Sequence, residues 1–196
     1  ASLDHVTLVA HYHDGTTING ESLIDTLGHD EHGPITHVSL NPPAHAYQPT
    51  LDAITQSTHI ILSPGDLYTS IVPILLVKGI PETIQQSNAH VTCISNLMTK
   101  KGETTGFDTA DFIRVLNHYL APATINSVIA NTQQPLPRIM REYKEEGSDM
   151  VTLDEQRVKD QGVDTIITQD LLLEDHVLRH HPQKTRDALF ACIDLN

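Results

Sequence analysis

The segment THIILSPGDLYTSIVPILLVKGI, residues 58–80, decides the fold that this sequence predicts. It opens with a short β-branched run and closes with a second apolar run. Between them stand a turn and several polar side chains: Pro64, Gly65, Asp66, Tyr68, Thr69 and Ser70. A strand that ends in such a turn and leads into a helix is typical of an α/β protein. Because ligands of open α/β sheets bind beyond the carboxyl ends of strands, these six residues are candidate site residues.

Strand and helix patterns alternate on both sides of this segment. The predicted strands are 5–12, 35–41, 59–63, 90–96, 124–131, 150–154 and 164–172. The main predicted helices are 108–120, 137–146 and 182–193, with shorter helical stretches at 49–57 and within 71–87. The pair Asp14-Gly15 predicts a β-hairpin near the start. Together these patterns predict a single α/β domain, residues 1–196, with a largely parallel sheet and a β-hairpin.

Composition narrows the classes of protein that this chain can represent. The net charge of −13 disfavours binding to nucleic acids or to anionic membranes. No apolar run approaches the roughly 20 residues that a membrane span needs. The chain shows no secretory signal pattern, and Cys93 and Cys192 are expected to be buried thiols. We therefore expect a cytoplasmic protein.

A second polar loop follows the next predicted strand. The segment SNLMTKKGETTGF, residues 95–107, brings Asn96 and Thr99 to a strand end, as residues 64–70 do for the preceding strand. Two such loops on neighbouring strands predict a cleft for a phosphorylated ligand, with backbone N–H groups and hydroxyls as donors. The carboxylate of Asp66 would repel an anionic ligand unless its side chain points away or a cation lies between them. The alternative is that these residues only form a turn and helix caps.

Histidines and nucleophiles give weaker signals. His11 and His13 alternate on one predicted strand, and residues 29–32 read HDEH, but no spacing defines a full set of zinc ligands. We predict no protein metal site, although a ligand-associated divalent metal stays open. No nucleophile with a base and an orienting group is recognisable. This favours a binding or regulatory protein over an enzyme.

Three long motifs resemble a known family. LSPGDLYTSIVPILLVKGIPETI, SNLMTKKGETTGF and LRHHPQKT resemble the YvcK proteins, known as gluconeogenesis factors, of the CofD-like superfamily. In that family the first motif reads like G-P-G-S-L-Y-T-S-I and the second like N-L-M-T-x-x-G-E-T-x-G-F. The resemblance implies a three-layer α/β/α Rossmann-like fold. It covers only the C-terminal part of the family's chain, so we expect the N-terminal glycine-rich nucleotide-binding segment to be missing here.

The resemblance also implies a function and two further site residues. It implies a regulator of cell morphogenesis and gluconeogenic growth that binds a nucleotide sugar, UDP-N-acetylglucosamine. Tyr143 and Arg179 match a tyrosine and an arginine linked to that ligand. Chemically, a tyrosine can stack on a ring and an arginine can fork onto a diphosphate. Members of the family commonly self-associate, so a homodimer stays open.

Two departures from the family motifs bear on the function. Asp66 replaces the usual Ser, and His181 replaces the usual Asp before a helix. The alternative function is a phosphotransferase like 2-phospho-L-lactate transferase, which moves a phosphorus-containing group to a flavin-like acceptor. In that branch the first motif carries an Asn that this chain lacks, so the binding regulator is favoured.

Overall fold

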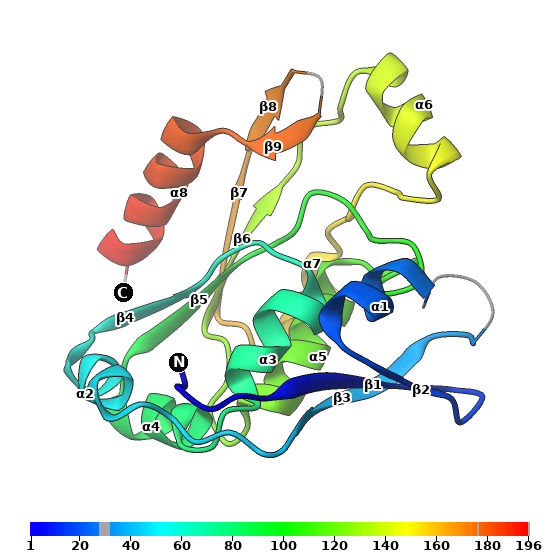
Figure 1. Cartoon of the computed structure of the whole chain (residues 1–196). Coiled ribbons are helices and arrows are strands. Elements are labelled where there is room, and N and C mark those ends of the chain that lie inside the picture. The colour runs from blue at the N-terminus through cyan, green and yellow to red at the C-terminus, as the bar shows by residue number, and fades with distance from the viewer. Residues whose placement is uncertain (28–31, 176, 196) are drawn as a thin grey trace.

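The core of the fold is a four-stranded parallel sheet (Figure 1). The computed structural model describes residues 1–27, 32–175 and 177–195. The strands of the sheet lie in the order β4 (His59–Leu62), β5 (His90–Ile94), β6 (Ser127–Asn131) and β7 (Thr165–Gln169). Each neighbouring pair is parallel, so the carboxyl ends of all four strands lie at the same end of the sheet. This confirms the predicted α/β fold with a largely parallel sheet.

Apolar side chains on both faces explain why these strands are central. In β6, Val128 and Ala130 join the larger core, whereas Ile129 between them joins the smaller one. Helices cover both faces, as parallel sheets require. The larger core lies against α3 (Val72–Leu75), α4 (Ile80–Ser87) and α5 (Thr109–Leu120), and the smaller against α8 (Pro182–Asp194). Cys93 and Cys192 are buried thiols, as predicted.

The predicted hairpin belongs to a separate antiparallel sheet. Its strand order is β2 (Thr17–Asn19), β1 (Thr7–Tyr12) and β3 (Ile35–Asn41). Gly15 in the turn has φ +89°, a conformation that favours glycine. Tyr119 of α5 accepts a hydrogen bond from the backbone N–H of Val38, which ties this sheet to the rest of the fold. The predicted Asp14-Gly15 hairpin is therefore confirmed.

The remaining elements connect and cover these sheets. They are α1 (Glu21–Leu27), α2 (Gln48–Gln56), α6 (Pro137–Glu145), α7 (Glu155–Asp160), β8 (Leu172–Glu174) and β9 (Leu178–His180). A single π-helical turn, Leu67–Ile71, precedes α3. The last two strands form a small antiparallel pair. No helix in the described ranges is long and apolar enough to cross a membrane.

Two strand predictions were wrong. Residues 150–154 form no strand: only Met150 makes an isolated bridge, with Met98. The backbone groups of this segment bond to a loop and a helix instead, because Val151 N–H donates to Leu97 O and Thr109 N–H donates to Thr152 O. The predicted strand 164–172 is divided into β7 and the start of β8. His181, which replaces the family's usual Asp before α8, makes no side-chain cap.

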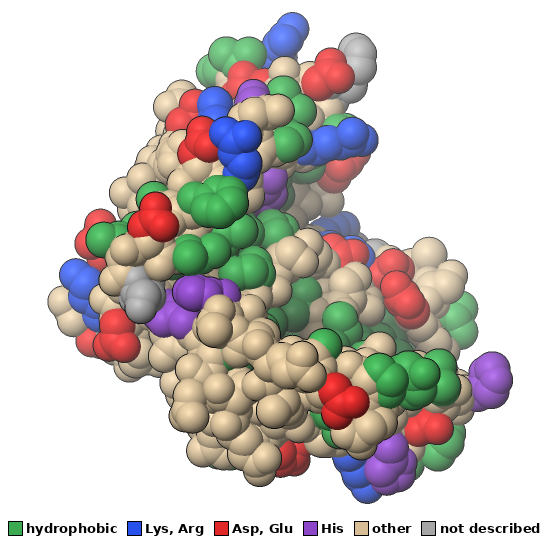
Figure 2. All heavy atoms as spheres, turned by 90° about the vertical axis from the view of Figure 1, so that its left-hand side faces the viewer, with side chains coloured by type: hydrophobic (Ala, Val, Ile, Leu, Met, Phe, Trp, Pro, Cys, Tyr) green, Lys and Arg blue, Asp and Glu red, His purple; other side chains and the backbone are tan. Residues whose placement is uncertain are grey.

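One edge of the parallel sheet is open and apolar. β4 is an edge strand, and an apolar groove of about 340 Å³ runs beside it. Isoleucines of β4, α2, α3 and α4 contribute to its lining: Ile54, Ile60, Ile61, Ile74, Ile80 and Ile84. Figure 2 views this side of the molecule and shows hydrophobic side chains gathered near its centre.

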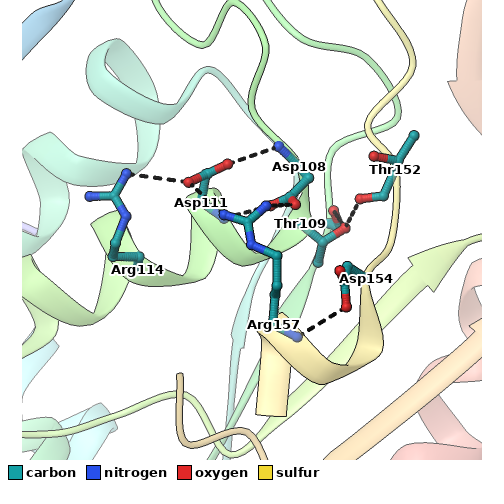
Figure 3. Close-up of polar contacts among 8 residues, drawn as sticks. Asp108, Thr109, Asp111, Arg114, Thr152, Asp154 and Arg157 are labelled. Atoms are coloured by element: carbon teal, nitrogen blue, oxygen red, sulfur yellow. Dashed lines mark hydrogen bonds and ion pairs between the residues drawn. The ribbon is translucent and has the colours of Figure 1, made fainter. Parts of the chain in front are cut away.

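A polar network fastens α5 to α7 (Figure 3). The side chain of Asp108 accepts from the N–H of Asp111 at 3.0 Å and so caps α5. Arg157 of α7 pairs with Asp108 and also reaches Asp111 at 3.4 Å. Asp154 caps α7 through the N–H of Arg157. The residue that caps α5 is thus also an ion-pair partner of α7.

Replacing Asp108 with alanine tests this arrangement. Asp108→Ala removes the N-cap of α5, and an N-cap contributes about 1–2 kcal/mol. We expect the free energy of unfolding to fall by about that amount, measured by urea denaturation followed by circular dichroism. Asp160→Ala on the exposed face of α7 is the control and should change little. Equal stability of Asp108→Ala and the unchanged protein would contradict the capping role.

Candidate functional site

A groove of about 350 Å³ lies at the carboxyl ends of β4 and β5. Four separate segments line it: the loop after β4, the loop after β5, α6 and β9. The lining residues are Pro64, Gly65, Asp66, Asn96, Leu97, Met98, Tyr143, Leu178, Arg179 and His180. The structure thus brings together six of the ten residues predicted from sequence.

Parallel pairing of β4 with β5 sets the two loops side by side. Leu62 at the end of β4 is in register with Cys93 of β5. The chain leaves both strands at the same edge, and Asn96 Nδ2 then donates to the carbonyl oxygen of Gly65 at 2.9 Å. This hydrogen bond joins the two loops directly, so it holds one wall of the groove together.

Two further hydrogen bonds attach the other wall. Tyr143 Oη accepts from the backbone N–H of Leu178 at 3.1 Å, which ties α6 to β9. His180 Nε2 lies 3.1 Å from the carbonyl oxygen of Ser95. Because a carbonyl only accepts, this imidazole nitrogen is the donor. Burial lowers the pKa of His180, and the bond to Ser95 opposes that shift, so the ring adds no full charge to the groove at neutral pH.

Arg179 is the cation of the groove lining. It is exposed on β9, and within the described ranges its guanidinium makes no hydrogen bond or ion pair. A guanidinium that the protein does not use can fork onto a phosphate or carboxylate of a ligand. The groove therefore offers one uncommitted positive charge beside a phenol ring, Tyr143.

A cation does intervene at Asp66, the residue that opposes an anionic ligand. Lys100 Nζ lies 2.7 Å from Asp66 Oδ2, so the ion pair links the loops after β4 and β5 a second time. The same ammonium lies 2.8 Å from Asp25 Oδ1 and 2.9 Å from Glu103 Oε1. Burial acts to lower the pKa of Lys100, but its hydrogen bonds to the three carboxylates outweigh this and raise the pKa above its usual value.

Among the described residues, the three carboxylates around Lys100 are the ones placed to hold a metal. Oxygen atoms of Asp25, Asp66 and Glu103 lie within 4.8 Å of one another. Glu103 is the buried member, with a side chain only 1% exposed. Burial raises the pKa of Glu103, Lys100 opposes the shift, and the two aspartates add to it. The sequence pattern did not point to this cluster, because its members lie far apart along the chain.

Four predicted site residues do not line the groove. Tyr68 and Thr69 lie in the π-helical turn and are buried, with exposed fractions of 4% and 5%. Ser70 lines the apolar groove beside β4 instead. Thr99 is buried, and its hydroxyl oxygen accepts from the N–H of Asp149. The π-helical turn therefore buries Tyr68 and Thr69, and the hydroxyl of Thr99 is taken up by its bond to Asp149.

Four lining residues were missed by sequence reasoning. Leu97, Met98 and Leu178 are ordinary apolar residues that carry no chemical signal. His180 stands next to Arg179 in the LRHHPQKT motif, and that adjacency was a usable signal. Its role as a support for the loop after β5 depends on a contact across 85 residues of sequence, which no local pattern encodes.

The described geometry does not support a histidine metal site or a cysteine nucleophile. His11 stacks on His37 with ring centroids 4.0 Å apart, and its Nε2 lies 3.2 Å from Ser39 Oγ. Residues 28–31, which hold most of the HDEH sequence, lie outside the described part of the chain. Burial raises the pKa of the Cys93 thiol to about 12, so this cysteine is not a thiolate nucleophile.

Comparisons with known proteins agree with this fold and identify a family. The family described as 2-phospho-L-lactate transferase CofD matches residues 1–172. A gluconeogenesis factor of Halalkalibacterium halodurans is 33% identical over 190 residues, covering 96% of this chain and 58% of the relative. A gluconeogenesis factor of Bacillus subtilis is 34% identical over 185 residues, covering 94% of this chain and 57% of the relative.

A solved structure gives the same picture. A crystal structure of a Bacillus halodurans protein matches with a TM-score of 0.89 and 33% identity, over 97% of this chain and 60% of that one. This chain therefore spans a little under three fifths of these two curated relatives' lengths. A family match over most of the chain, with relatives that agree in sequence and in fold, shows that the chain belongs to the CofD family and resembles its gluconeogenesis factors of the YvcK type.

Proposed function

We propose that this protein binds a nucleotide sugar, UDP-N-acetylglucosamine, in the groove at the ends of β4 and β5. One observation carries the proposal: four segments far apart in sequence converge there and bring Tyr143 and Arg179 to the same groove as Gly65 and Asn96. The resemblance of the motifs to the family independently links this tyrosine and this arginine to the same ligand.

The chemistry of the lining suits a diphosphate attached to rings. Arg179 supplies a positive charge for the diphosphate, and Gly65 allows the backbone to approach it closely. Tyr143 supplies an aromatic face for uracil or the sugar. Lys100 neutralises part of the charge of Asp66, which reduces its repulsion of the phosphates.

The proposed role is regulation rather than catalysis. Relatives of this chain are named gluconeogenesis factors. We propose that occupancy of the groove reports the supply of nucleotide sugar and adjusts cell morphogenesis and growth on gluconeogenic carbon sources. A cytoplasmic homodimer is the proposed form. Because the chain spans a little under three fifths of those relatives, the remaining contacts of the ligand would come from outside the matched region.

The second candidate function is a phosphotransferase. The description of the matching family, 2-phospho-L-lactate transferase, favours it. The first motif weighs against it, because the transferase motif has an Asn in this region that this chain lacks. The two candidates differ in the ligand that the groove accepts.

Isothermal titration calorimetry separates the two candidates. The regulator should bind UDP-N-acetylglucosamine saturably and more tightly than UDP alone, because the sugar adds contacts. A flavin-like acceptor should release no heat. Binding of the flavin-like compound without binding of the nucleotide sugar would favour the transferase and overturn the proposal.

Arg179→Ala tests the proposed diphosphate contact. We expect the affinity for UDP-N-acetylglucosamine to weaken by about 1.5–3 kcal/mol, the usual range for a hydrogen bond to a charged group. Arg186→Ala is the matched control, because Arg186 pairs with Asp187 on α8 and is absent from the groove lining. Unchanged affinity of Arg179→Ala in the same titration would remove Arg179 from the site.

Two substitutions of Tyr143 separate stacking from hydrogen bonding. If the ring stacks on the ligand, Tyr143→Phe should keep most of the affinity, whereas Tyr143→Ala should lose about 0.5–1.5 kcal/mol. Tyr47→Ala, at an exposed tyrosine outside the groove, is the control. An equal loss in the Phe and Ala variants would show that the hydroxyl and its bond to Leu178 matter instead of the ring face.

A further inference from the structure

The carboxylates around Lys100 outnumber the cations that face them. Asp25, Asp66 and Glu103 carry three negative charges, and Lys100 is the one cation within ion-pair distance of them in the described part of the chain. Like charges this close repel one another strongly when one of them is buried. One ammonium group therefore leaves the cluster with an excess of negative charge.

Glu103 points into this cluster with one partner for its two carboxylate oxygens. Its side chain is 1% exposed; Oε1 pairs with Lys100 Nζ at 2.9 Å, and Oε2 has no hydrogen-bond partner within the described ranges. Among the residues that the structure describes, Tyr12 Oη also is buried without a partner, and the charge of Glu103 adds to the effect of burial in raising the pKa of Tyr12. Unpartnered buried polar groups are rare and costly, and a bound ion or water is a common reason for them.

The position of Lys100 Nζ shows that a cation fits between the three carboxylates. The ammonium nitrogen lies 2.7–2.9 Å from one oxygen of each. Calcium binds oxygen at about 2.3–2.6 Å, so it needs the carboxylates to close in by only a few tenths of an ångström, whereas magnesium at about 2.0–2.1 Å needs more. An all-oxygen donor set selects hard cations over zinc or copper.

We propose that Asp25, Asp66 and Glu103 form a binding site for a hard divalent cation of calcium or manganese size, which exchanges with the ammonium of Lys100. The stem of Lys100 is partly exposed, with 29% of the side chain accessible, so the ammonium can leave toward solvent. The two positive charges of the incoming ion offset more of the carboxylate charge than one ammonium does.

The cation site touches the groove through one residue. Asp66 lines the groove and also belongs to the cluster. A bound divalent cation would lower the negative charge at that end of the groove and favour an anionic ligand. This consequence rests on the proposed function, but the cation site itself does not.

Titration with Mn²⁺ alone, without nucleotide, tests the site. The free-Mn²⁺ signal in electron paramagnetic resonance should fall to show one saturable site per chain, and Ca²⁺ should compete for it. Lys100→Met removes the competing ammonium, so Mn²⁺ affinity should rise by roughly tenfold or more, while Asp25→Asn and Glu103→Gln should weaken it by a similar factor. Asp170→Asn, which changes a carboxylate paired with Lys184 elsewhere, should behave like the unchanged protein.

Two results would overturn this inference. The first is the absence of saturable Mn²⁺ binding below about 1 mM in the unchanged protein. The second is equal Mn²⁺ affinity in Asp25→Asn and the unchanged protein, a comparison that remains decisive if Lys100→Met or Glu103→Gln does not fold. Failure of nucleotide-sugar binding alone would leave the cation site standing.

Discussion

The parallel pairing of β4 with β5 is the constraint on which the candidate site depends. It places the carboxyl ends of both strands side by side. The loops that follow them are then joined by the hydrogen bond from Asn96 to Gly65. Apolar side chains on both faces hold these strands between two layers of helices, so the strand ends form a rigid base. Tyr143 and His180 then fasten α6 and β9 onto that base.

The balance of charge where the two loops meet is the second feature on which the proposed site depends. Asp66 brings a negative charge to a place where an anionic ligand is proposed, and Lys100 from the neighbouring loop meets it at 2.7 Å. The same ammonium serves Asp25 and Glu103, so the balance of charge at this end of the groove depends on one side chain. Arg179 on the other side has no such commitment within the described residues, which makes it the natural contact for an anion.

Local sequence patterns predicted the elements that local physics determines. The amphipathic period of residues 108–120 and the capping side chain of Asp108 gave α5 almost to the residue. Residues 150–154 also alternate, but Val151 satisfies its N–H at Leu97 O, a loop atom that a strand pattern cannot anticipate. The segment packs on the core through Val151 and Leu153, without the ladder of hydrogen bonds that defines a strand.

The site was predictable in part for the same reason. Strand ends and small polar residues identified Gly65 and Asn96, and the resemblance identified Tyr143 and Arg179. The π-helical turn that buries Tyr68 and Thr69 is a detail of backbone geometry with no distinct residue pattern. The contacts of Lys100 with Asp66 and Asp25 cross 34 and 75 residues of sequence, so the carboxylate cluster became visible only in three dimensions.

Hydrogen–deuterium exchange with and without UDP-N-acetylglucosamine tests the central claim most directly. If the groove is one ligand site, the ligand should slow amide exchange together in three separate segments: residues 64–66, 96–98 and 178–180. The amides of α2, which contributes no residue to the groove lining, should exchange as before. Protection confined to one of the three segments, or found only outside them, would contradict the account.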